Sequence, residues 1–379
     1  MTTLELTAPS LAAPASAGLK VLHVVRQFHP NRGGLEDFVA NLGRAQVRSG
    51  CEVRILTCDR IFSNPGQLLA AEADFDGMRI RRLPYYGSSK YPLVPSLLSH
   101  LGDADIVHVH AIDFFFDALA LTWPLHRKPL VATTHGGFFH TADRKRLKQL
   151  WFRGPTRLSS RAYGAIIGCS DNDARQFSQI AADRVTTIEN GVDLEKFAGS
   201  ASSSLAKSMV TVGRFSKNKR LDRLIEMAAQ LKQQDPAWQL HIAGIASDWS
   251  PADLQGMIDA AGVTSNVTVH ANLTDSELRA LFARASFFVS ASEYEGFGIA
   301  LIEAMSAGLR CVVHPNASFE ALASRHQAIR LADFSKPADV CRILQAAYAD
   351  GATYADPDLS EHDWARVAAR YRAVYCRLV

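Results

Sequence analysis

Two glutamates, Glu295 and Glu303, lie eight positions apart in the segment from Ser292 to Gly308. A short apolar run, Phe287–Ser290, predicts a strand that leads through a Gly-containing turn into a helix. Backbone N–H groups at such a helix start can bind a phosphate or a sugar hydroxyl. Because Glu295 precedes the helix, the two carboxylates can reach different parts of one extended ligand, where each can accept hydroxyl protons of a ribose or a hexose.

An alternative interpretation makes Glu295 a charge of the first helical turn and Glu303 a solvated helix residue. The residues flanking Glu303 are apolar, and an unpaired buried carboxylate is costly. The sequence therefore favours ligand binding by both glutamates.

A basic loop follows the first predicted strand of the second half of the chain and contains Arg214 and Lys219. Arginine offers a bidentate fork and lysine a point charge, which together suit two linked phosphates without a metal ion. A solvated basic loop is the alternative, since most runs of charge are exposed. The neighbouring pair of glutamates favours the diphosphate hypothesis.

Two weaker indications of ligand binding come from residues that follow predicted strands in the first half of the chain. Adjacent Gly33 and Gly34 would let the backbone approach a ligand closely, although as a plain turn they would be unremarkable. His135 follows another strand and could contact a donor sugar or stabilise charge near a reaction centre, although a lone histidine is more often structural.

Alternating strands and helices must position these residues. The first half of the chain predicts strands at Leu19–Val25, Val53–Thr57, Ile106–His110, Leu130–Thr134, Ala165–Cys169 and Val185–Ile188, with a helix over Leu35–Val47. The second half predicts strands at Met209–Val212, Gln239–Ala243, Val267–His270, Phe287–Ser290 and Cys311–His314, with helices around Leu221–Lys232, Asp275–Arg284 and Ala300–Ala307. This alternation is typical of parallel sheets covered by helices.

The length of 379 residues favours two domains. We expect a disordered tail over 1–18, an N-terminal Rossmann-like domain over 19–197, and a C-terminal one over 205–359, joined by an Ala-, Gly- and Ser-rich linker. The strand ends of both domains would meet at a shared cleft. We expect a final helix at 360–379, and the fold class is α/β.

Composition limits the classes of function. A net charge of +3 is too small to indicate nucleic acid binding, and no segment is apolar for long enough to span a bilayer. The tail lacks the basic and apolar regions of a secretory signal. Six cysteines without a CxxC pair favour a reducing cytoplasm.

Two acidic strings resemble metal-binding motifs. One is Asp103 and Asp105, ahead of a strand; the other is Asp171 and Asp173, after Ser170. Ser170 as a helix cap followed by first-turn acids explains the second string fully. We therefore predict no metal site and no cofactor requirement.

With these motifs the chain resembles retaining glycosyltransferases of family 4, which have the GT-B fold of two Rossmann-like domains and a deep cleft between them. The resemblance is carried by GRFSKNKR, SEYEGFGIALIEAMSAG, the Gly-Gly loop, THGG, ENGVD and DWARVAARYRAVY, and it runs from about Leu19 to the C-terminus. It implies a ribose contact for Glu303, a diphosphate contact for Arg214 and Lys219, a phosphate or acceptor contact for Gly33 and Gly34, and a return of the last helix to the first domain. Donor-sugar contacts are implied for Glu295, Gly296, Phe297, Gly298 and Ile299, and a place near the sugar 6-hydroxyl and the reaction centre for His135.

A closer likeness is to bacterial α-mannosyltransferases that extend polyprenyl-diphosphate-linked oligosaccharides in exopolysaccharide assembly of the xanthan and acetan type. It implies GDP-mannose as donor and a lipid-linked oligosaccharide as acceptor. One departure is Arg310, where such chains often carry proline in Gly-x-Pro-Val. The residues themselves leave open a UDP-glucose or UDP-N-acetylglucosamine donor, a nucleotide-sugar epimerase, and a sugar-binding subunit without turnover.

The segment Asp143–Arg161 holds seven basic residues and one acid, interspersed with leucines and a tryptophan. Such a stretch can lie on anionic lipid at the inner face of the cell membrane, or it can be a solvated helix pair. The sequence does not decide between the two.

Overall fold

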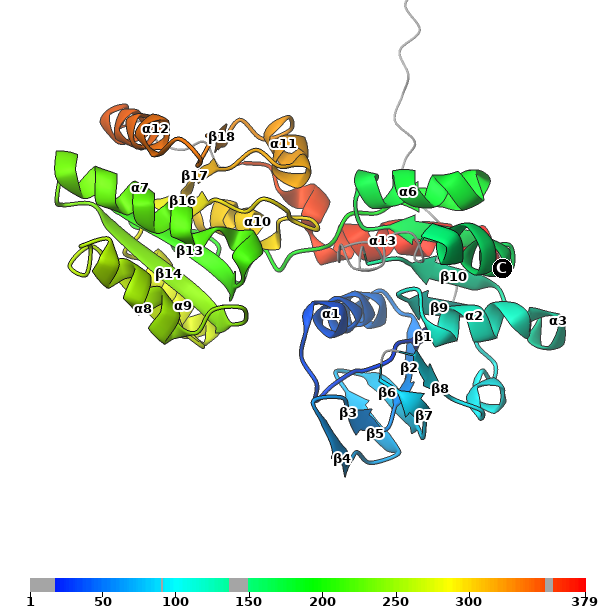
Figure 1. Cartoon of the computed structure of the whole chain (residues 1–379). Helices are drawn as coiled ribbons and strands as arrows, with labels where there is room; N and C mark the ends of the chain where they lie inside the picture. Colours follow the sequence, from blue (N-terminus) through cyan, green and yellow to red (C-terminus); the bar gives the residue numbers. More distant parts are fainter. Residues whose placement is uncertain (1–17, 90, 136–148, 352–356) are drawn as a thin grey trace, which may run out of the picture.

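Two parallel sheets organise the chain, each covered by helices (Figure 1). The computed structural model describes residues 18–89, 91–135, 149–351 and 357–379. The predicted disordered tail therefore lies almost entirely outside the described residues. Within them, the predicted α/β class with two parallel sheets is confirmed.

The N-terminal sheet has eight strands in the order β12-β11-β10-β9-β1-β2-β6-β5. All neighbours pair in parallel except β5, which runs antiparallel to β6 at the edge. Its strands are β1 (Lys20–Val24), β2 (Glu52–Cys58), β5 (Glu72–Phe75), β6 (Met78–Leu83), β9 (Ile106–His110), β10 (Leu130–Thr133), β11 (Ala165–Gly168) and β12 (Val185–Thr187). Each of the six predicted strands ends within one residue of its prediction.

The sequence reasoning missed the region between β2 and β9. It contains β5 and β6, and two small hairpins made of β3 (Arg60–Ile61) with β4 (Asn64–Leu68) and β7 (Tyr86–Ser88) with β8 (Tyr91–Leu93). The first four residues of β6 alternate, with Met78 and Ile80 buried and Arg79 and Arg81 exposed. Such alternation is the signal of a half-exposed strand.

The C-terminal sheet has six strands, all parallel, in the order β15-β14-β13-β16-β17-β18. Its strands are β13 (Ser208–Phe215), β14 (Gln239–Ala246), β15 (Val267–Ala271), β16 (Phe287–Ser290), β17 (Arg310–Val313) and β18 (Ile329–Leu331). β18 was not predicted, and β13 and β14 extend three residues past their predicted ends. These extensions carry β13 through Gly213 and Arg214.

Helices cover both sheets. Around the first sheet lie α1 (Gly34–Arg48), α2 (Phe114–Leu121), α3 (Trp123–His126), the π-helical turn η2 (Phe152–Thr156), α5 (Arg157–Ser160) and α6 (Asp171–Ala181). Around the second lie α7 (Leu221–Gln234), α8 (Pro251–Ala260), α9 (Asp275–Phe282), α10 (Ile299–Ala307), α11 (Ala317–Ala323) and α12 (Pro337–Ala349). α8 and α9 each begin at a complete capping box, Ser250 with Asp253 and Thr274 with Glu277, which satisfies otherwise unpaired backbone N–H groups.

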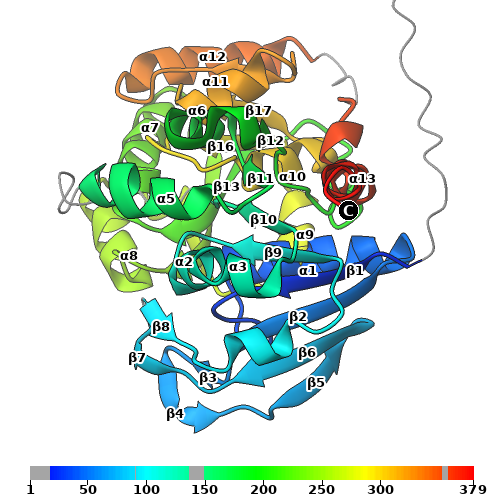
Figure 2. The ribbon, with the colours of Figure 1, turned by 90° about the vertical axis from the view of Figure 1, so that its right-hand side faces the viewer.

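The last helix, α13 (Trp364–Tyr375), returns to the N-terminal unit and packs against α1 (Figures 1 and 2). Trp364, Tyr371 and Tyr375 are buried in the same core as β1 and β2. Burial of each such aromatic side chain contributes about 2–3 kcal/mol. A Cβ at Gly191 would lie 2.4 Å from the Trp364 ring, so only glycine allows this close approach of the chain to α13.

Candidate active site

A cleft of about 990 Å³ lies between the two units and is lined by residues of both. Its walls contain the carboxyl end of β13 and the segments that follow β10, β11 and β16, where ligands of open parallel sheets bind. The lining residues that the sequence predicted are Gly34, His135, Arg214, Lys219, Glu295, Gly296, Phe297, Gly298, Ile299 and Glu303. The structure thus brings together residues from Gly34 to Glu303 at one concave surface.

The acidic loop between β16 and α10 forms one wall of the cleft. It ends at Gly298, the residue before α10, whose φ of 102° is left-handed and costs little only for glycine. A Cβ there would also lie 3.1 Å from the Phe319 ring. The Ser318 hydroxyl donates to the Glu295 carbonyl oxygen at 2.7 Å, which fixes the loop against α11.

The basic loop after β13 is joined to this acidic loop. The Lys219 Nζ donates to Glu295 Oε1 at 2.6 Å, and both side chains are at most one-fifth exposed. The Asn218 side-chain amide donates to the Tyr294 carbonyl oxygen at 2.7 Å. Among the described residues Arg214 has no carboxylate partner, and it is exposed at the cleft. The two predicted phosphate ligands therefore differ, because one already neutralises a carboxylate.

Glu303 lies one helical turn into α10, with its side chain 17% exposed. Burial raises the pKa of its carboxyl, and the nearby Lys196 ammonium partly offsets that rise. The distance from Lys196 Nζ to Glu303 Oε1 is 3.6 Å, and the same Nζ lies 2.9 Å from Asp275 Oδ1. Glu303 is thus a largely buried carboxylate that faces the cleft and is supported by one cation.

The two adjacent glycines have different environments. Gly34 begins α1 and lines the cleft, and a Cβ built on it would meet no atom within 4 Å. Gly33 precedes the helix in an extended conformation and does not line the cleft. A Cβ there would lie 2.6 Å from Glu36 Oε2, so Gly33 makes room for that carboxylate. Of the pair, Gly34 is the one placed to meet a ligand.

His135 lines the opposite wall of the cleft. Its φ of 52° is left-handed, a conformation that a residue with a Cβ rarely adopts. Burial lowers the pKa of its imidazole to about 3, so the ring is neutral at physiological pH. Its Nε2 lies 3.0 Å from His110 Nδ1, and its Nδ1 lies 3.7 Å from Cys169 Sγ. His135 is therefore not an isolated histidine.

The two acidic strings, Asp103 with Asp105 and Asp171 with Asp173, make other contacts within the protein. Asp103 pairs with Lys20 and Arg54, and Asp105 accepts from the Lys20 backbone N–H at 2.8 Å. Ser170 caps α6, with its hydroxyl accepting from the Asp173 backbone N–H. The Asp173 carboxylate, which also lines the cleft, accepts from the Thr134 hydroxyl. The contacts of Asp103, Asp105 and Asp173 are those of structural residues.

Several cleft residues were missed by the sequence reasoning. They come from α6 and from loops beside the predicted motifs: Leu35, Cys169, Ser170, Asn172, Asp173, Arg175, Gln176, Gln179, Asn190, Val212, Gly213, Ser216, Asn218, Tyr294 and Ala300. The strand-end rule that selected His135 applies equally to Ser170 at the end of β11. The helix start predicted at Ser170 also indicated the polar face that carries Arg175 and Gln179.

The structure also places Arg310, and two further sequence segments lie outside the described residues. The Arg310 guanidinium lies over the Phe287 ring, 5.9 Å from its centroid, which is a packing contact away from the cleft. The glycines of the THGG motif, Gly136 and Gly137, lie outside the described residues, as does the first part of the basic segment, 143–148.

This fold and cleft define the class of protein. The chain superposes on sucrose-phosphate synthase from Thermosynechococcus elongatus with a TM-score of 0.67, at 17% identity over 95% of this chain and 94% of that one. A likeness at this identity shows the fold, which is the GT-B fold of glycosyltransferases.

Family models divide the chain into two adjoining matches. The model described as Glycosyltransferase Family 4 matches residues 32–196, and the model described as Glycosyl transferases group 1 matches residues 194–356. The chain belongs to glycosyltransferase family 4.

Two relatives carry the same name, GDP-mannose:cellobiosyl-diphosphopolyprenol alpha-mannosyltransferase. The protein from Komagataeibacter xylinus is 42% identical over 365 residues, covering 94% of this chain and 93% of its own. The protein from Xanthomonas campestris is 42% identical over 376 residues, covering 93% and 95%. The predicted resemblance to family 4 and to its exopolysaccharide mannosyltransferases is confirmed.

Proposed function

We propose that this enzyme transfers mannose from GDP-mannose to cellobiosyl-diphosphopolyprenol, with retention at the anomeric carbon, during exopolysaccharide assembly. The observation that carries the proposal is 42% identity to enzymes of that name over 94% of the chain, which includes both walls of the cleft. Membership of a transferase family favours group transfer over the epimerase and the non-catalytic subunit that the motifs alone left open.

The charged wall of the cleft suits the donor. Arg214 lies near the end of β13 and Lys219 in the short turn that follows, and both line the cleft, where their positive charges can meet two linked phosphates. Glu303 on α10 can accept the two hydroxyl protons of the ribose, and Lys196 behind it partly offsets the cost of burying the carboxylate. Glu295 and the backbone N–H groups of Gly296–Ile299 can then hold the sugar hydroxyls. The ion pair between Glu295 and Lys219 orients both groups before the donor arrives.

The reaction that follows moves one proton and one glycosyl group. An acceptor hydroxyl oxygen forms a bond to the anomeric carbon on the face from which the diphosphate oxygen leaves, and that diphosphate oxygen takes the hydroxyl proton. The departing GDP carries increased negative charge, which Arg214 and Lys219 stabilise. The cations of the protein take the part that a divalent ion plays in other transferases.

A donor panel tests the proposal. The purified enzyme is incubated with GDP-mannose, UDP-glucose or UDP-N-acetylglucosamine, each with a cellobiosyl-diphosphopolyprenol acceptor and EDTA, and the product is identified by mass spectrometry. We expect mannosylated acceptor from GDP-mannose alone, with an α-linkage by NMR. Transfer of glucose or N-acetylglucosamine instead would contradict the donor assignment, and activity that EDTA abolishes and a divalent metal restores would contradict the metal-free mechanism.

We further propose that an apolar and basic face of the N-terminal unit meets the membrane that holds a lipid-linked acceptor. No described helix is both long enough and apolar enough to cross a bilayer. The neighbouring elements α2, α3 and α5 nevertheless carry large exposed apolar side chains, with Leu121 83% and Leu125 77% exposed. Leu158 is 65% exposed and stands beside the exposed Arg157. Apolar side chains flanked by cations suit an anionic lipid surface.

Vesicle binding tests this face. The variant Leu121→Asn/Leu125→Asn and the variant Arg153→Glu/Arg157→Glu should each lose co-sedimentation with phosphatidylglycerol vesicles. Arg342→Glu, an exposed charge reversal on α12 in the other unit, serves as the matched control and should bind as the unmodified protein does. Vesicle binding that survives both double substitutions would refute the assignment.

A further inference from the structure

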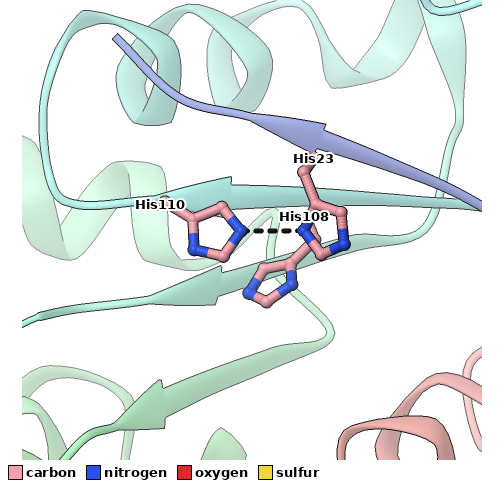
Figure 3. A group of neighbouring side chains, drawn as sticks. All are labelled: His23, His108 and His110. Carbon is pink, nitrogen blue, oxygen red and sulfur yellow. Dashed lines mark hydrogen bonds between the residues drawn. The ribbon is translucent and has the colours of Figure 1, made fainter. Parts of the chain in front are cut away.

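A continuous chain of hydrogen bonds runs from the cleft into the core of the N-terminal unit. It begins at His135 Nε2, which lies 3.0 Å from His110 Nδ1. His110 Nε2 lies 2.8 Å from His23 Nδ1 (Figure 3), and His23 Nε2 lies 2.7 Å from Gln46 Oε1. His110 and His23 are completely buried, and Gln46 is 1% exposed. The ring at the cleft is thus connected to a side-chain amide in α1 through two histidines of β9 and β1.

A second arm leaves the same amide toward the last helix. Gln46 Nε2 donates to the Tyr375 hydroxyl at 3.2 Å, and that hydroxyl lies 2.7 Å from His108 Nδ1. His108 Nε2 in turn lies 2.7 Å from Thr133 Oγ1. The Gln46 amide is therefore held from both sides, by a histidine on one and by α13 on the other.

His23, His108 and His110 also have the composition of a metal site, since one ring nitrogen of each lies within 4.8 Å of the others (Figure 3). Each of their six ring nitrogens, however, already lies within hydrogen-bond distance of a partner. A metal ion would have to displace these partners at a place without solvent access. The contacts favour a hydrogen-bond network.

The direction of the network follows from the chemistry of one amide. Burial lowers the pKa of His23 to about 4 and that of His110 well below its ordinary value, so both rings are neutral, with one donor and one acceptor nitrogen each. The structure places the Gln46 oxygen toward His23 and the amide nitrogen toward Tyr375. In this orientation the oxygen accepts, so His23 carries its proton on Nε2 and accepts at Nδ1. His110 must then donate from Nε2 and accept at Nδ1, and His135 must donate from its own Nε2.

We propose that Gln46, acting through His23 and His110, holds His135 in the tautomer protonated on Nε2, so that Nδ1 presents a lone pair to a substrate hydroxyl. The present partner of that Nδ1 is the Cys169 thiol at 3.7 Å, a weak donor that a hydroxyl can displace. A lone pair there accepts from a sugar hydroxyl and repels a phosphate oxygen. Gln46, His23 and His110 are positioning residues, and the identification of the hydroxyl as a sugar's rests on the proposed function.

Nitrogen NMR of protein labelled with ¹⁵N-histidine tests the tautomers directly. We expect His135, His110 and His23 each to show a protonated Nε2 and a bare Nδ1 at pH 7. The His135 signals are assigned as those that are missing from the spectrum of the His135→Asn variant. A proton on Nδ1 of His135, or averaged signals from both tautomers, would overturn the inference. The spectra need no substrate, so this outcome is independent of which sugar the enzyme transfers.

Two substitutions of one residue give a second measurement. Gln46→Glu keeps an acceptor facing His23 and should retain the His135 tautomer, whereas Gln46→Leu removes the acceptor and should give mixed tautomers. For Gln46→Leu we expect kcat/KM to fall about tenfold, which corresponds to one hydrogen bond of about 1.4 kcal/mol, with Gln46→Glu restoring most of the loss. Tyr371→Phe removes an equally buried hydroxyl beyond His108 and is the matched control. Equal losses in all three folded variants, with an unchanged His135 spectrum, would reduce Gln46 to a packing role.

Discussion

The groups that follow the strand ends of the two cleft walls differ in charge. The C-terminal wall presents ion-paired groups, with Lys219 on Glu295 and Lys196 near Glu303. The N-terminal wall carries the charged Asp173 and Arg175 of α6, and after β10 it presents His135, a ring that burial keeps neutral and that is backed by further neutral histidines. Under the proposed function these groups have different tasks, because a diphosphate needs fixed cations whereas sugar hydroxyls near the reacting carbon need uncharged hydrogen-bond partners.

We expect the largest effect from removing a lysine whose positive charge meets the departing diphosphate. Lys219→Ala should lower kcat/KM about 10²- to 10³-fold, because the diphosphate charge that grows as the sugar departs would lose its stabilising partner. Steady-state transfer of radiolabelled mannose measures it. Lys217→Ala, an exposed lysine of the same loop outside the cleft, is the control and should stay within twofold. A near-normal rate for Lys219→Ala would remove the charged wall from the mechanism.

The two glutamates should separate binding from turnover. Glu303→Ala should weaken GDP affinity about 100-fold by calorimetry, since two charge-assisted hydrogen bonds of about 1.5 kcal/mol each would be lost. Glu295→Ala should instead lower kcat more than it changes GDP affinity. The partly exposed Glu293, which pairs with Arg220, supplies Glu293→Ala as a control. If both cleft variants lose GDP binding equally, the assignment of ribose and sugar to different glutamates is wrong.

His135 should matter for turnover and not for nucleotide binding. His135→Ala should reduce kcat about 10- to 100-fold while GDP affinity stays the same, because the ring would contact a hydroxyl near the reacting carbon. His100→Ala, a histidine outside the cleft, should leave both quantities unchanged. Weakened GDP binding in His135→Ala would show that the two walls share the nucleotide.

Acid should destabilise the protein through the same neutral histidines. The pKa values of His23, about 4, and His135, about 3, lie below the ordinary 6.5, so at pH 5 the unfolded chain binds protons that the folded chain does not. Stability is therefore lost as pH falls below about 6.5, by about 2 kcal/mol at pH 5 for one such histidine. The calorimetric Tm should fall by several degrees from pH 7 to pH 5. An unchanged Tm would mean that these rings are already charged at pH 5 in the folded protein.

Much of the fold and of the charged wall follows from local sequence. Apolar runs located eleven of the strands, and the spacing of Glu295 and Glu303 around a glycine turn located the helix that carries the second of them. The strands that were missed are short, at an edge, or half exposed, as β6 and β18 are, and their patterns are weak over so few residues.

What the sequence by itself determined is the set of groups whose spacing lies within one strand, turn and helix: Arg214 with Lys219, Glu295 with Glu303, and the glycines between them. Only the tertiary structure decided the surroundings of His135. His23 and His110 are 87 positions apart, and Gln46 and Tyr375 are 329 apart. They meet because β1 and β9 are parallel neighbours and because α13 returns to α1, and no local pattern records which strands will be neighbours.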